Sequence, residues 1–136
     1  MRILLAVIGN DVHVVANRII DQFLSARQFT VANLGVACKP NEIIDAIEEF
    51  EPDITIISSL NGEGQSWGRE FIDCFKSLDT TSRIVLGGNL YPRSSQKTIE
   101  ETEGTFYGLG FDKVLDYRRP LSDLYKYISE QRYACN

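Results

Sequence analysis

The stretch MRILLAVIGNDVHVVANRIIDQFL, residues 1–24, contains the repeating unit of the fold. Residues 3–8 are apolar without in-out alternation, which is typical of a strand buried on both faces of a parallel sheet. After a polar loop, apolar side chains recur with a helical period at Val14, Val15, Ile19, Ile20, Phe23 and Leu24. The stretch therefore predicts a buried strand, a polar loop and an amphipathic helix.

The same unit recurs along the chain. Further apolar runs cover residues 31–35, 54–58, 84–86 and, more weakly, 113–115. The helices that follow are expected to begin near Asn41 (as N-cap, with Glu42 in the first turn), Trp67, Ser94 and Pro120. This pattern predicts an α/β fold with one domain over residues 1–136. We expect a flavodoxin-like (Rossmann-like), doubly wound sheet of five parallel strands in the order 2-1-3-4-5, with helices on both faces.

The composition excludes several classes of function. The chain has 14 Lys+Arg against 19 Asp+Glu, a net charge of −5 and no basic run, so we expect no nucleic-acid partner. Its three cysteines are far apart, form no disulfide or zinc pattern, and suit a reducing cytoplasm. The apolar run at residues 3–8 is too short for a signal peptide or a membrane span. We therefore expect a cytoplasmic protein without a membrane partner.

The expected fold also predicts where a ligand would bind. In open parallel sheets, ligands lie beyond the carboxyl ends of the strands, where the strand order reverses. The first, third and fourth strands surround that point here. The segments that leave them, residues 9–16, 58–64 and 87–91, are rich in polar residues and glycine.

The first of these segments holds Asp11 and His13, which is the only histidine of the chain. A carboxylate that accepts a hydrogen bond from one imidazole nitrogen raises the basicity of the other, an arrangement found behind metal-bound histidines. The alternative is that Asp11 caps the first helix and His13 is an exposed loop residue. One histidine cannot build a zinc site from protein ligands alone, so a metal here would arrive within a cofactor.

The other two segments are less specific. Ser58 could donate a hydrogen bond to a ligand, and Gly87 and Gly88 would allow a ligand to approach the backbone, but both patterns also fit ordinary loops. A receiver domain would need an aspartate where Ser58 stands, and the phosphate-binding loops of flavin and dinucleotide sites are absent from the sequence. These exclusions leave a ligand that uses Asp11 and His13.

In this order, DVHVVANRIID, SSL and GGN closely resemble the Asp-x-His-x-x-Gly, Ser-x-Leu and Gly-Gly signature of cobalamin-binding domains. The resemblance extends to the segments VIGN, VANLGV, ISSLNGEG, VLGGN and LGFDKV. With them, the chain is similar to the small, sigma subunits of glutamate mutase (methylaspartate mutase) over roughly residues 3–115. The resemblance implies an isomerase component that binds adenosylcobalamin, a cobalt corrinoid. With a larger barrel subunit it would rearrange L-glutamate to 3-methylaspartate by radical chemistry, and alone it would be inactive.

The resemblance also implies roles for individual residues. His13 would replace the cofactor's own dimethylbenzimidazole as the lower cobalt ligand, and Asp11 would hydrogen-bond the far imidazole nitrogen. The displaced nucleotide tail would run into the domain beside the sheet. The implied cofactor-binding residues are Asn10, Asp11, Val12, His13, Val14, Ala16, Ser58, Ser59, Leu60, Gly87, Gly88, Asn89, Leu90 and Tyr91. No catalytic residue is expected on this chain, because the substrate would be held by the partner subunit.

Ala16 departs from the family pattern, since the third motif residue is usually glycine. Its methyl group takes space beside the incoming tail, so we expect weaker or slower cofactor uptake. Two alternatives stay open. One is a corrinoid carrier for methyl transfer or cofactor delivery, although such carriers usually possess an added helical cap domain. The other is a non-enzymatic regulatory module in which Ala16 marks lost cofactor binding.

Overall fold

A computed structural model describes residues 1–10, 13–60, 62–91 and 96–134. Strands and helices alternate along the whole chain, as the sequence predicts. Their bounds are β1 Arg2–Val7, α1 Val14–Ser25, β2 Thr30–Asn33, α2 Pro40–Phe50, β3 Ile54–Ser58, α3 Gly64–Phe75, β4 Arg83–Gly88, α4 Ile99–Tyr107, β5 Lys113–Asp116 and α5 Leu121–Ala134.

The strands form one sheet in the order β2-β1-β3-β4-β5, with every neighbouring pair parallel. This confirms the predicted flavodoxin-like order. The register pairs Val7 of β1 with Ser58 of β3, and Ser58 with Gly87 of β4. The carboxyl ends of these three strands therefore lie side by side, and the segments that leave them start from one edge of the sheet.

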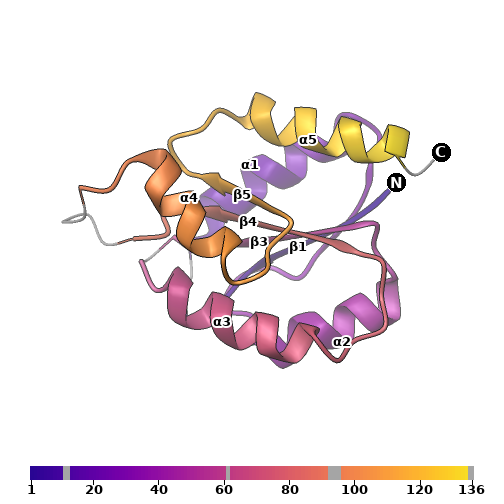
Figure 1. Ribbon diagram of the computed structural model, residues 1–136. Coiled ribbons are helices and arrows are strands. Elements are labelled where there is room, and N and C mark those ends of the chain that lie inside the picture. The colour runs from indigo at the N-terminus through magenta and orange to yellow at the C-terminus, as the bar shows by residue number, and fades with distance from the viewer. Residues whose placement is uncertain (11–12, 61, 92–95, 135–136) are drawn as a thin grey trace.

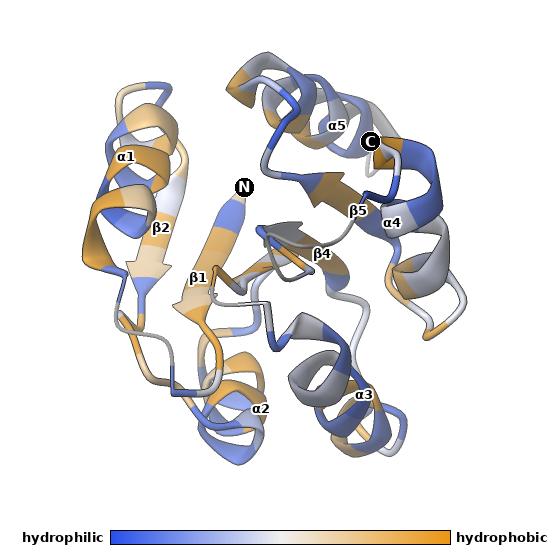
Figure 2. Ribbon diagram, turned by 90° about the vertical axis from the view of Figure 1, so that its left-hand side faces the viewer, coloured by the Kyte–Doolittle hydropathy of each residue, from blue (hydrophilic) through white to orange (hydrophobic). Residues whose placement is uncertain are grey.

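Helices cover both faces of the sheet. Figures 1 and 2 show α1 and α5 on one face and α2 and α3 on the other. Leu24 of α1 and Ile128 of α5 belong to one buried apolar cluster, and Ile43 of α2 and Phe71 of α3 belong to a second. Both faces of the central strands are thus buried, which explains why their sequences show no in-out alternation.

Three helices begin away from the expected position. The N-cap of α2 is Lys39 rather than Asn41, because Pro40 has no N–H to satisfy and suits the first helical position. Helix α3 begins at Gly64, before Trp67; glycine is a weak helix former, so its propensity concealed the start. Helix α4 begins at Ile99, where Thr98 forms a capping box with Glu101.

The expected start of the fourth helix at Ser94 lies outside the described residues. No helix in the described part of the chain combines the length and the apolar character needed to cross a membrane.

Candidate functional site

A cavity of about 250 Å³ lies between the sheet and the two helices α1 and α5. Its walls come from α1, from the ends of β3, β4 and β5, and from the start of α5. The lining residues are Ala16, Ile19, Ile20, Ile56, Ser58, Leu60, Val85, Gly87, Gly88, Leu115, Asp116, Tyr117, Arg119, Pro120, Leu121 and Leu124. Most of these side chains are apolar, so the cavity suits a weakly polar group.

Five of the residues singled out from the sequence line this cavity: Ala16, Ser58, Leu60, Gly87 and Gly88. They come from three separate segments, which the parallel sheet brings together at one edge. The three exits therefore contribute to the walls of one cavity, and its use as a binding site stays a prediction.

The glycine pair at the end of β4 is required by close packing. Gly88 has a φ of +109°, and a Cβ there would lie 2.3 Å from the Ser59 carbonyl oxygen. A Cβ on Gly87 would lie 3.1 Å from the Leu115 carbonyl oxygen. Side chains at these positions would push β3, β4 and β5 apart, so the pair keeps the cavity walls together.

His13 is the N-cap residue of α1, and it is exposed at the same edge of the sheet. The imidazole is therefore accessible to a ligand, and its role as a cobalt ligand stays a prediction. Asp11 and Val12 lie outside the described residues, so the hydrogen bond between Asp11 and His13 stays a prediction. Val14 follows in the first turn of α1 and is 41% exposed.

Asn10 lies in the segment that leaves β1, and its side chain contacts the connection between β2 and α2. Its Oδ1 accepts a hydrogen bond of 2.6 Å from Lys39 Nζ. Lys39 precedes α2, so this bond joins the exit of β1 to the exit of β2. The sequence gives no signal for this contact, because the two residues are 29 positions apart.

Ser59 lies away from the cavity. It is fully buried, and a Cβ on Gly64 at the start of α3 would lie 3.4 Å from its Oγ. Among the described residues, the Ser59 Oγ is a buried oxygen without a hydrogen-bond partner. Asn89 contributes its backbone, since its carbonyl accepts a hydrogen bond of 3.3 Å from the Gly62 N–H.

Leu90 and Tyr91 do not line the cavity. Leu90 is fully buried in the cluster shared with α2 and α3. The Tyr91 ring packs edge-on against Phe106 at 5.7 Å between ring centroids, and the Lys97 ammonium lies 4.4 Å from its ring centroid. These two residues hold the third exit against the core; Leu90 lies near Ser59 at the start of α3, and neither residue lines the cavity.

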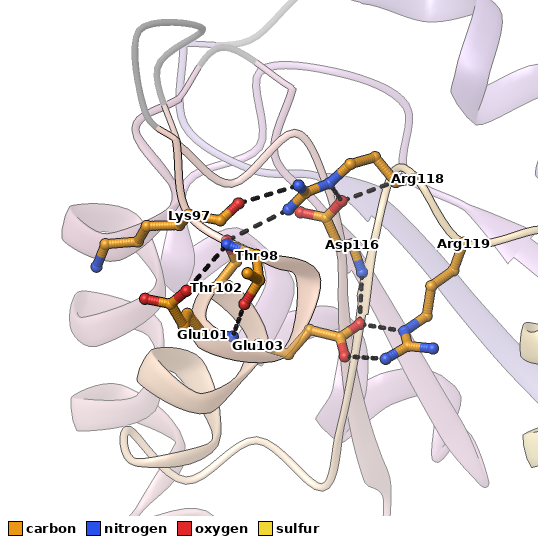
Figure 3. A network of polar contacts seen from close by, with 8 residues as sticks. All are labelled: Lys97, Thr98, Glu101, Thr102, Glu103, Asp116, Arg118 and Arg119. Atoms are coloured by element: carbon orange, nitrogen blue, oxygen red, sulfur yellow. Dashed lines mark hydrogen bonds and ion pairs between the residues drawn. The ribbon is translucent and has the colours of Figure 1, made fainter.

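Sequence reasoning missed the exit of β5, which supplies the rim of the cavity. Asp116 accepts hydrogen bonds from Arg118, and Arg119 donates two hydrogen bonds to the buried carboxylate of Glu103 (Figure 3). These hydrogen bonds with Glu103 raise the pKa of Arg119 further above its usual value. The run DYRRP after a weak apolar segment is the one signal that could have indicated this rim.

Each arginine of this rim is already occupied. The Arg118 guanidinium donates to Asp116, to the Lys97 carbonyl and to the Thr102 hydroxyl (Figure 3). Arg119 lies against Glu103 and, at 3.6 Å, Asp123. The rim is therefore a fixed support for the cavity wall, and its two cations are balanced by carboxylates.

The comparisons with known proteins give consistent results. The B12 binding domain family model matches residues 1–114. Glutamate mutase sigma subunit 2 of Haloarcula marismortui is 36% identical over 114 residues, which are 84% of this chain and 76% of that protein. The glutamate mutase sigma subunit of Escherichia coli O157:H7 is 31% identical over 129 residues, 90% of this chain and 81% of that protein.

Solved structures share the fold at low sequence identity. A cobalamin-binding protein from Desulfitobacterium hafniense DCB-2 superposes with a TM-score of 0.75 at 20% identity; the match covers 96% of this chain and 58% of that one. The receiver domain of NarL from Mycobacterium tuberculosis superposes with a TM-score of 0.66 at 15% identity, covering 95% and 93%. These likenesses show the fold alone, which serves more than one kind of ligand.

Proposed function

Because the chain belongs to the B12-binding domain family and, within it, to the glutamate mutase sigma subunits, we propose that it is the adenosylcobalamin-binding component of a glutamate mutase. The observation that carries the proposal is the position of the cavity. It opens between α1 and α5 at the edge of the sheet where His13 is exposed.

The residues present fit such a cofactor. The nucleotide tail of cobalamin ends in a flat aromatic base, and the cavity has largely apolar walls, with polar side chains from Ser58, Asp116, Tyr117 and Arg119. Ser58 is the residue that would hydrogen-bond a ring nitrogen of the base. Because Gly87 and Gly88 have no side chain, the ends of β3 and β4 lie close enough together to form one wall of the cavity.

His13 is the proposed lower ligand of the cobalt, and Asp11 is proposed to orient its imidazole. Asn10, Val12, Val14 and Asn89 complete the proposed surroundings of the corrin and the tail, with Ser59, Leu90 and Tyr91 supporting them from the core side. Ligation through the exposed imidazole would leave the tail free to enter the cavity. The protein would thereby replace the internal base of the cofactor with one of its own residues.

Bound adenosylcobalamin supplies the radical chemistry of the rearrangement, while the protein binds, orients and shields it. Arg119, which lines the cavity, and its neighbour Arg118 are both held by carboxylates, so neither is available to clamp a dicarboxylate substrate. We therefore place the glutamate site on a larger barrel subunit, and we expect this chain alone to be inactive.

The test is a titration of the purified chain with adenosylcobalamin, monitored by absorbance and equilibrium dialysis. The wild-type chain is expected to bind, and His13→Gly is expected to lose on the order of 10–100-fold in affinity. Adding a glutamate mutase barrel subunit should then give glutamate rearrangement with adenosylcobalamin and none with methylcobalamin. A chain that binds no cobalamin, or a His13→Gly variant with unchanged affinity, would overturn the proposal.

A further inference from the structure

We infer that Lys39 and Trp67 are positioning residues that fix Gly9 and Asn10, so that the imidazole of His13, three positions after Asn10, is held ready for cobalt. The inference rests on the proposed function, because it concerns the same histidine. It adds two side chains from other parts of the sequence, one before α2 and one in α3, to a site otherwise defined by the exits of β1, β3 and β4.

The connection between β2 and α2 lies directly against the exit of β1. The Gly9 N–H donates a hydrogen bond of 2.7 Å to the Cys38 carbonyl, and Ile8 forms a parallel bridge with Cys38. The next residue, Lys39, donates 2.6 Å from Nζ to Asn10 Oδ1. Cys38 therefore holds Gly9 through the backbone, and Lys39 holds Asn10 through a hydrogen bond between side chains.

Trp67 closes the same contact from α3. Gly9 has a φ of +85°, and a Cβ there would lie 2.4 Å from Trp67 Nε1, so the indole lies directly on the Gly9 backbone. The indole N–H donates a hydrogen bond of 3.2 Å to Oε2 of Glu63, the N-cap residue of α3. Lys39 Nζ lies 4.9 Å from the indole ring centroid, within the range of a cation–π contact. Lys39 therefore contacts both Asn10 and Trp67.

This contact constrains His13 because few residues separate them. His13, the N-cap residue of α1, is three positions after Asn10. Three residues span at most about 10 Å. Fixing Asn10 at one end, while α1 fixes the chain from Val14 onward, reduces the conformations that the imidazole must lose on ligation. Asn10 is exposed and Lys39 is half-buried, so their bond adds little to global stability. Its main effect should be on the histidine.

The test uses Lys39→Met, Lys39→Arg and Asn10→Ala, with Lys76→Met as the matched control. Lys76 follows α3 at its far end, and its ammonium forms an exposed ion pair of 3.8 Å with Asp73. Because His13 is the only histidine, a sample labelled with nitrogen-15 histidine reports one imidazole, and its resonances measure coordination to added adenosylcobalamin. Affinity is measured by equilibrium dialysis, and thermal unfolding checks the fold.

Lys39→Met is expected to lower adenosylcobalamin affinity by up to about tenfold, the scale of the entropy lost when one flexible side chain must be ordered on binding. The coordinated fraction of His13 should fall with it, while the unfolding temperature stays that of the wild type. Lys39→Arg, which keeps the cation and the donor, should restore both. Asn10→Ala in the Lys39→Met background should add nothing further, since the two residues act through one bond.

Two outcomes would overturn the inference: Lys39→Met with wild-type affinity and wild-type imidazole coordination, or an equal loss in Lys76→Met. Binding of the isolated tail nucleoside, α-ribazole, distinguishes an effect on the cavity from an effect on His13. It should be unchanged in Lys39→Met, and its loss there would assign the effect to the cavity and overturn the positioning role. If the wild-type chain binds neither α-ribazole nor adenosylcobalamin, the proposed function itself fails.

Discussion

Glu103 of α4 holds Arg119, which follows β5, with two hydrogen bonds of 2.6 Å from Nε and Nη2. The same carboxylate accepts a hydrogen bond of 2.9 Å from the Asp116 backbone N–H, and Glu103 is only 5% exposed (Figure 3). One buried side chain thus joins α4 to the exit of β5, where Asp116 and Arg119 form the rim of the cavity.

Glu103→Gln is expected to destabilise the chain. An amide keeps one acceptor oxygen for three N–H donors and turns an NH₂ group toward the guanidinium. We expect a loss of about 1–3 kcal/mol in the free energy of unfolding, because Arg119 stays partly solvated. Urea denaturation measures this. Asp123→Asn is the control: its carboxylate lies 3.6 Å from Arg119 on the surface, and its loss should cost under about 0.5 kcal/mol. Equal losses of unfolding free energy in both variants would contradict the role of Glu103 as the buried support of Arg119.

Ala16→Gly is expected to speed cobalamin uptake. The Ala16 methyl group lies on the wall of the cavity, and glycine would widen the passage beside α1. The change should raise the association rate severalfold while destabilising α1 by about 0.5–1 kcal/mol. Stopped-flow absorbance with adenosylcobalamin measures the rate.

Ala46→Gly controls for helix propensity, because Ala46 is a half-buried alanine of α2 outside the cavity. It should lose stability to a similar degree without any gain in rate. If Ala16→Gly binds cobalamin no faster than the wild type, the methyl group is not what limits uptake.

The fold was predictable because its signal is local. Each buried strand is a short run of Val, Ile and Leu, as at residues 54–58, where prediction and structure coincide. Each helix except the fourth, which is indicated mainly by its position between two strands, has its own apolar stripe. The errors arose at helix ends, where a single residue sets the boundary. Helix α2 begins nearer the N-terminus than predicted because Pro40 suits the first helical position. Helix α3 begins at Gly64, although glycine has a low helix propensity.

The site was predictable only where it lies on strand exits. Ser58, Gly87 and Gly88 follow from the rule for parallel sheets, and they line the cavity. The wall from α5 and the rim at Arg119 depend on how the last helix packs over the sheet. The bond between Lys39 and Asn10 joins distant loops. Contacts of this kind leave no periodic trace in a single sequence.

Gly88→Ala is expected to damage both the fold and the site. The φ of +109° disfavours any side chain, and the new Cβ would lie 2.3 Å from the Ser59 carbonyl oxygen, which backbone movement alone can relieve. We expect a loss of at least about 2 kcal/mol. Gly104→Ala is the matched control, since nothing lies within 4 Å of its Cβ position in α4. It should stabilise the chain by about 0.5–1 kcal/mol. Calorimetry compares the two, and a neutral Gly88→Ala would show that the strand ends are not tightly packed.

Ile19→Trp should block the cavity without harming the fold. Ile19 lines the cavity from α1 and is 49% exposed, so an indole can be accommodated at the surface while covering the opening. Forcing the tail past that ring should weaken α-ribazole and adenosylcobalamin binding by about tenfold or more, the scale of an overpacked contact. Val15→Trp is the control on the same helix, because Val15 is 72% exposed and outside the cavity wall. It should bind both ligands as the wild type does. Should Ile19→Trp bind them equally well, the nucleotide tail does not enter between α1 and α5, and the placement of the cofactor along this face of the sheet is wrong.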